Sequence, residues 1–133
     1  AELVATDVAP RMLERARKRV GGGVRFCEMD AARPDVAGRF DLICGNLVFQ
    51  WLEEPSEALQ KLAEQLAPGG VIAVSTLLDG TFEEWRQACT AEGLVAATPD
   101  YPAARTVKGW QPGLCAGKWT TERCVQPFAN STL

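Results

Sequence analysis

Three polar residues stand where predicted strands end, and their types could bind a ligand: Asp7, Asp30 and Asn46. The strands are predicted from the apolar segments 2–7, 24–30 and 40–47. Ligands of parallel α/β sheets bind beyond the carboxyl ends of the strands, where a carboxylate can accept hydrogen bonds from both hydroxyls of a ribose. Each residue alone could instead cap a helix or close a turn. Because they follow successive strands, we expect them to line a single crevice.

The elements that must position these residues alternate between strand and helix. Pro10 suits the first turn of a helix, and apolar residues recur at helical spacing over 10–20. We expect a helix from Glu53 through Leu66 that stops at Pro68, a fourth strand over 71–77 buried on both faces, and a helix over 81–91. The segment 31–38 is predicted to be a loop, and 119–128 a strand after the Pro/Gly-rich stretch 98–117. This order predicts a parallel α/β sheet with helices on both faces.

Composition narrows the classes of function. The 133 residues suffice for one domain, 1–133, and 47% hydrophobic with 23% charged residues is typical of a globular chain. The net charge of −3 argues against a nucleic-acid partner, and no apolar run approaches the roughly 18 residues of a membrane span. The chain has no histidine, which excludes histidine triads and histidine metal sites, and we expect no metal.

Cysteine usage bears on the compartment. No two cysteines stand in a C-x-x-C spacing, so a zinc cluster or a redox dithiol is not expected. We expect buried, reduced thiols of a cytoplasmic protein at Cys27, Cys44, Cys89, Cys115 and Cys124.

Longer runs of sequence resemble a known family. ATDVAPRMLERARKR is similar to the second strand and following helix of class I S-adenosylmethionine-dependent methyltransferases, and MDAARP to their adenine-binding third-strand segment. FDLICGNLVFQWLEEPSEAL and LAPGGVIAVSTL resemble their fourth strand, the next helix and the fifth strand. NLVFQWL, STLLDGTFEEWRQA and WTTERCVQPFANSTL resemble the malonyl-acyl-carrier-protein O-methyltransferases of biotin synthesis. The resemblance covers nearly the whole chain.

This resemblance implies S-adenosyl-L-methionine as the cofactor and assigns residues to its nucleoside. Asp7 would hold the ribose hydroxyls, and Val8 and Met12 would flank the adenine ring. Asp30 would accept a hydrogen bond from the adenine amino group, with help from the backbone of Ala31.

The same resemblance assigns the reacting end of the site. Asn46 and Leu47 would lie under the methionine end of the cofactor, near the methyl group. Gln50 and Trp51 would face the substrate, although Trp51 could equally be a core aromatic at the start of a helix. No catalytic residue is assigned, because an ionised carboxylate acceptor needs no general base and the cofactor carries the reactivity.

One feature of the family is missing from the sequence. The first strand of these enzymes carries a glycine-rich loop, acidic-x-G-x-G-x-G, and the glycines at 21–23 are not that loop because they follow a helix and precede a strand. The predicted fold is therefore a Rossmann-like class I methyltransferase sheet that lacks its first strand, truncated at both ends. That strand would lie between segments 2–7 and 40–47. We therefore expect the chain alone either to bind the cofactor poorly or to fold poorly.

The resemblance implies methyl transfer to a carboxylate, that of malonyl-acyl-carrier protein in biotin biosynthesis. An arginine should meet the acceptor carboxylate, and Arg86, Arg105 and Arg123 are the candidates. The basic run at 11–19 could meet an acidic carrier protein, or be a solvated helix face. Three alternatives stay open: a methyltransferase for another small-molecule acceptor, a non-catalytic methyltransferase-like scaffold and, ranked below both, a nicotinamide dehydrogenase.

Overall fold

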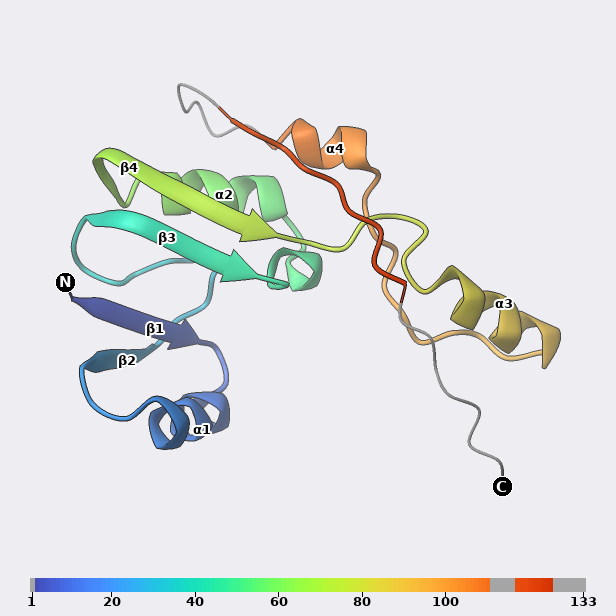
Figure 1. Cartoon of the computed structure of the whole chain (residues 1–133), viewed down its shortest axis with the longest axis horizontal. Coiled ribbons are helices and arrows are strands. Elements are labelled where there is room, and N and C mark those ends of the chain that lie inside the picture. The colour runs from blue at the N-terminus through green and yellow to red at the C-terminus, as the bar shows by residue number, and fades with distance from the viewer. Residues whose placement is uncertain (1, 111–116, 126–133) are drawn as a thin grey trace.

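The computed structural model describes residues 2–110 and 117–125 of the chain. Strands and helices alternate through its first two thirds (Figure 1). In chain order the elements are β1 (Leu3–Asp7), α1 (Pro10–Val20), β2 (Val24–Glu28), β3 (Phe40–Asn46), the 3-10 turn η1 (Phe49–Trp51), α2 (Pro55–Ala63), β4 (Leu66–Ser75), α3 (Glu83–Ala91) and α4 (Ala104–Lys108).

The four strands form two parallel pairs rather than one sheet. β1 pairs with β2, ending at the register pair Asp7 and Glu28, and β3 pairs with β4, ending at Asn46 and Ser75. All four strands run in the same direction, with β3 and β1 as the facing edges of the two pairs (Figure 1). Within the described residues no ladder joins β1 to β3. This gap between β1 and β3 is the position at which the sequence predicts a missing strand.

One hydrophobic core lies against the β3–β4 pair. Phe49 is 2% exposed and packs with Ala58, Leu59 and Leu62 of α2 and with Val107 and Trp110 from the α4 region. Gly45 makes room for this core, because a Cβ there would lie 3.3 Å from Cε2 of Phe49. The η1 turn, α2 and α4 are therefore held on the same strand pair.

The other pair is covered by α1. Leu13 is the buried residue of this helix. The Arg17 guanidinium lies 5.3 Å from the centre of the Phe26 ring and donates a hydrogen bond to the Phe26 carbonyl at 3.3 Å. Gly21 ends the helix with φ of 78°, a left-handed value that glycine adopts without strain.

Two expectations about the second half of the sheet are wrong. The helix predicted to continue through Leu66 ends at Ala63, and Leu66 is instead the first residue of β4. Leu66 pairs with Phe40, and the register of the two strands shifts between Phe40 and Leu42. The strand is also not buried on both faces, since Val71 is 55% exposed. The cause is that Ile72 and Val74 on one face pack against the hydrophobic core, whereas Val71, Ala73 and Ser75 alternate with them on the other face and are exposed.

The last third departs further from expectation. The Pro/Gly-rich stretch contains the short helix α4, which the sequence did not predict. Residues 119–125 form no strand, and the rest of the predicted strand, 126–128, lies outside the described residues. Cys89 is buried and Cys27 half-buried, but Cys44 and Cys124 are exposed, so the expectation of buried thiols is wrong for these two; Cys115 lies outside the described residues.

Candidate functional site

The three strand-end residues lie on one edge of the structure. Asp7 is the last residue of β1, Asn46 is the last residue of β3, and Asp30 follows the end of β2. Because the four strands are parallel, their carboxyl ends point the same way (Figure 1). The fold therefore places the three residues at the carboxyl ends of their strands, as the sequence predicts, and the single crevice that they would line stays a prediction.

Both aspartates close local turns through one carboxylate oxygen. Oδ1 of Asp7 accepts a hydrogen bond from the Ala9 N–H at 2.8 Å, and Oδ1 of Asp30 accepts one from the Ala32 N–H at 2.9 Å. Oδ2 of Asp30 also lies 3.4 Å from the Arg33 guanidinium. Oδ2 of Asp7 has no hydrogen-bond partner among residues 2–110 and 117–125, so it is available to a ligand.

An apolar surface lies beside Asp7. Val8 is 66% exposed and Met12, in the first turn of α1, is 50% exposed. Ala31, behind Asp30, is half-buried. An exposed valine and methionine next to a carboxylate offer a place for a flat ring beside a polar group. No described side chain buries either of them.

The end of β3 is fixed by a residue of β4. Asn46 Oδ1 lies 2.5 Å from the Ser75 hydroxyl, and the Leu47 N–H donates to Ser75 Oγ at 3.2 Å and to the Ser75 carbonyl at 3.1 Å. Leu47 has φ of 54°, a left-handed conformation that costs a non-glycine residue about 1–3 kcal/mol. Sequence reasoning missed Ser75, because a serine inside an apolar strand carries no signal of its own.

The substrate-side candidates lie on the η1 turn. Trp51 is 69% exposed, so the alternative that it is a core aromatic is wrong; the buried aromatic of this turn is Phe49. Gln50 is half-buried, and its Oε1 is buried without a hydrogen-bond partner in the described structure. The turn thus exposes the Trp51 ring and buries one polar atom of Gln50 that has no described partner.

The three candidate arginines differ in exposure and in the partners of their guanidinium groups. The Arg86 guanidinium donates to the Pro99 carbonyl at 2.5 Å, lies 3.6 Å from Asp100, and is only 28% exposed. Arg123 lies 3.8 Å from Glu84, with both side chains exposed. Of the three, only Arg105 has no ion-pair or hydrogen-bond partner within the described part of the chain, and it is exposed on α4.

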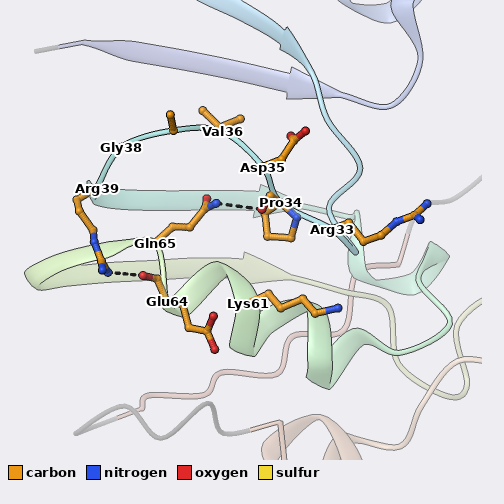
Figure 2. A pocket seen from close by; sticks show the side chains of 10 residues that line it. Arg33, Pro34, Asp35, Val36, Gly38, Arg39, Lys61, Glu64 and Gln65 are labelled. Carbon is orange, nitrogen blue, oxygen red and sulfur yellow. Dashed lines mark hydrogen bonds between the residues drawn. The ribbon is translucent and has the colours of Figure 1, made fainter.

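A hollow elsewhere on the surface does not include the predicted site residues. It lies between the loop 33–39 and the end of α2 (Figure 2). Three of its polar side chains already bond to the backbone: Arg39 to Glu64 and Leu66, Gln65 to Pro34 at 3.1 Å, and Lys61 to Ala32 at 3.3 Å. We interpret this region as the place where the loop 33–39 is attached to α2.

Two further structural findings concern other kinds of site. Across the described residues, no three or more cysteine, aspartate or glutamate side chains gather as a metal-binding group. No described helix is both long and apolar enough to cross a membrane.

The fold and the strand-end residues together define a class of protein. A parallel α/β arrangement with a free carboxylate oxygen and an open apolar surface at the strand ends is typical of domains that bind a nucleoside-containing cofactor. The family model described as "Methyltransferase domain" matches residues 1–74, more than half of the chain. The chain therefore belongs to the methyltransferase domain family, within the class I S-adenosylmethionine-dependent methyltransferases.

Curated relatives align along nearly the whole chain. The biotin biosynthesis bifunctional protein BioCD of Bordetella avium is 37% identical over 127 residues, which cover 95% of this chain and 27% of that protein. A malonyl-[acyl-carrier protein] O-methyltransferase of Magnetococcus marinus is 34% identical over 131 residues, covering 96% of this chain and 47% of that protein. The chain is homologous to these proteins and spans less than half the length of either.

Solved structures support the same fold. The N-methyltransferase NodS of Bradyrhizobium japonicum, in complex with S-adenosyl-L-homocysteine, superposes with a TM-score of 0.61 at 27% identity, covering 82% of this chain and 52% of NodS. The amino pentose methyltransferase CalS10 of Micromonospora echinaspora, bound to S-adenosylmethionine, gives 0.53 at 28% identity over 58% of this chain and 34% of CalS10. The α/β methyltransferase fold is thereby established.

Proposed function

We propose that the protein of which this chain forms a part transfers the methyl group of S-adenosylmethionine to a carboxylate, the free carboxyl of malonyl-acyl-carrier protein in biotin biosynthesis. The observation that carries this proposal is the alignment of 95–96% of the chain with a biotin biosynthesis protein and with a malonyl-[acyl-carrier protein] O-methyltransferase. The acyl-carrier protein is thus the proposed partner.

The proposed nucleoside site is built around Asp7. Its free Oδ2 would accept from the ribose hydroxyls, while Oδ1 stays in the turn with Ala9. The exposed side chains of Val8 and Met12 would flank the adenine ring. Asp30 would accept from the adenine amino group, an arrangement supported by its position after the neighbouring strand β2.

The proposed reacting end lies at the end of β3 and on η1. Asn46 and Leu47 would contact the methionine part of the cofactor, and Gln50 and Trp51 would contact the acceptor. The exposed Trp51 ring supports this assignment, because no described residue covers it, and the half-buried Gln50 precedes it on the same turn.

The proposed chemistry makes modest demands on the protein. Bound S-adenosylmethionine supplies an activated methyl group, and the acceptor carboxylate is ionised at neutral pH. The chain's residues must therefore hold the carboxylate oxygen in line with the methyl carbon and sulfur, and exclude water from it. The bond broken is sulfur–methyl and the bond formed is oxygen–methyl, which gives a methyl ester and S-adenosylhomocysteine. Arg105, the unpartnered candidate, is the first arginine to test as the acceptor's counter-ion.

We further propose that another parallel strand, with the glycine-rich loop at its end, lies between β1 and β3 in the complete protein. Both strands have an edge without a ladder among the described residues, and the strands run in the same direction. One parallel strand in this position would pair with both edges.

Calorimetric titration with S-adenosylmethionine tests these proposals. It should be run on this chain and on a form extended upstream through the proposed strand. We expect tight binding by the extended form and weak or no binding by the chain alone, because the loop is proposed to hold the ribose and methionine parts. Absence of binding in both forms would contradict the cofactor site and favour a non-catalytic scaffold.

An acceptor comparison tests the substrate. The form that binds the cofactor should methylate malonyl-acyl-carrier protein in preference to other acids and to phenols. Equal or better activity on a small molecule would favour the alternative of a methyltransferase for another acceptor.

A further inference from the structure

The hydroxyl of Ser75 joins both residues that end β3. It lies 2.5 Å from Asn46 Oδ1 and 3.2 Å from the Leu47 backbone nitrogen. A serine hydroxyl has one proton to donate and lone pairs to accept. It can therefore donate to the Asn46 carbonyl oxygen and accept from the Leu47 N–H at the same time. One side chain thus fixes both an amide side chain and a turn.

The turn at Leu47 needs this support. A leucine disfavours the left-handed region, and φ at Leu47 is 54°. Its N–H is shared between the hydroxyl and the carbonyl of Ser75, at 3.2 and 3.1 Å. Asn46 and Ser75 are also the last register pair of β3 and β4. The strained conformation is thus held from β4 at the point where the ladder ends.

We propose that Ser75 is a positioning residue for the methionine end of the cofactor, an inference that rests on the proposed function. Because Asn46 Oδ1 is engaged by Ser75, the amide nitrogen of Asn46 is the group left for a ligand, and Asn46 is exposed. No partner of that nitrogen lies within the described residues. Its two N–H groups suit a ligand oxygen such as the carboxylate of an amino-acid moiety.

The test compares two ligands in the form of the protein that is extended upstream through the proposed strand. S-adenosylhomocysteine carries the amino-acid end, whereas 5′-methylthioadenosine lacks it and keeps the nucleoside. We expect Ser75→Ala to weaken binding of S-adenosylhomocysteine by roughly three- to tenfold, as the loss of one hydrogen bond predicts. Binding of 5′-methylthioadenosine should stay within twofold of wild type. Ser75→Thr, which keeps the hydroxyl, should restore the affinity for S-adenosylhomocysteine.

Thr76→Val is the matched control. It removes the neighbouring hydroxyl, whose Oγ1 is buried without a partner in the described structure, and should leave both affinities unchanged. If Ser75→Ala weakens both ligands equally, or neither, the positioning role is overturned. The positioning role is also overturned if the wild-type protein binds S-adenosylhomocysteine no more tightly than 5′-methylthioadenosine, because the amino-acid end then adds no affinity. Absence of binding of either ligand by wild type overturns the proposed function itself.

Discussion

The substitutions Asp7→Asn and Asp7→Ala should separate the two roles of the Asp7 carboxylate, in the local turn and in ligand binding. Oδ1 of Asp7 accepts from the Ala9 N–H at 2.8 Å and serves the turn, whereas Oδ2 is proposed to serve the ribose. Asp7→Asn keeps an acceptor oxygen for the turn but replaces the second oxygen and its charge with an NH2 group. Asp7→Ala removes both.

The expected magnitudes follow from that division. A hydrogen bond to a charged group contributes about 1.5–3 kcal/mol, so Asp7→Asn should weaken S-adenosylmethionine binding by about 10- to 150-fold with little change in Tm. Asp7→Ala should weaken binding at least as much. It should also cost about 1 kcal/mol of folding free energy, a fall in Tm of roughly 3–6 °C, because the turn loses its acceptor.

Titration calorimetry and thermal unfolding measure both effects on the same samples of the form extended upstream through the proposed strand, which is the form expected to bind the cofactor. Asp41→Asn is the matched control, since Asp41 is an exposed carboxylate near the opposite, amino end of β3. If Asp7→Asn binds S-adenosylmethionine within twofold of wild type while remaining folded, Asp7 is a turn residue and the proposed ribose contact is refuted.

Two further predictions concern the core and the acceptor. Gly45→Ala should destabilise the fold by about 1–3 kcal/mol in denaturant unfolding, because the new Cβ would lie 3.3 Å from Phe49 Cε2. Gly22→Ala, where a Cβ meets nothing within 4 Å, should be near neutral, and equal effects would contradict the close-packing argument. Arg105→Ala should raise the KM for the carboxylate acceptor by about tenfold or more with cofactor affinity unchanged. Arg123→Ala should leave KM unchanged, and an unchanged KM in both would exclude Arg105 as the acceptor's counter-ion.

Local signals in the sequence were sufficient for the first half of the fold. Pro10 begins α1 and Gly21 ends it, as their backbone preferences predict. The first three strands lie within a few residues of their predicted bounds, since apolar runs between turn residues report strands directly. These features depend on neighbours in the chain, and the sequence contains them.

Features decided by distant contacts were not predictable in this way. Leu66 continues the helical spacing of Leu59 and Leu62, yet it joins β4 because it pairs with Phe40. The short helix α4 forms in a Pro/Gly-rich stretch, where Val107 packs in the core beside α2. Helical periodicity cannot distinguish a last helical turn from the first residue of a strand. In each case tertiary packing, rather than the local sequence, determines the secondary structure.

The same distinction applies to the candidate site. Asp7, Asp30 and Asn46 could be proposed as site residues because their positions after strands follow from the chain alone. Ser75 was not, because its contact with Asn46 depends on the register of β3 against β4, which joins residues 29 apart. Residues placed by their position after a strand are thus easier to predict than residues placed by a contact between strands.

The structural and the ligand-binding interpretations of the aspartates are compatible. A turn needs one acceptor, and a carboxylate has two oxygens. At Asp7 the hydrogen bond from Ala9 fixes the carboxylate in one orientation and leaves Oδ2 available. A side chain held in this way loses less rotamer entropy when a ligand binds, and therefore binds it more tightly. Local turn chemistry at a strand end is thus a way to orient a ligand-binding carboxylate, and finding it at Asp7 does not weaken the case for a ribose site.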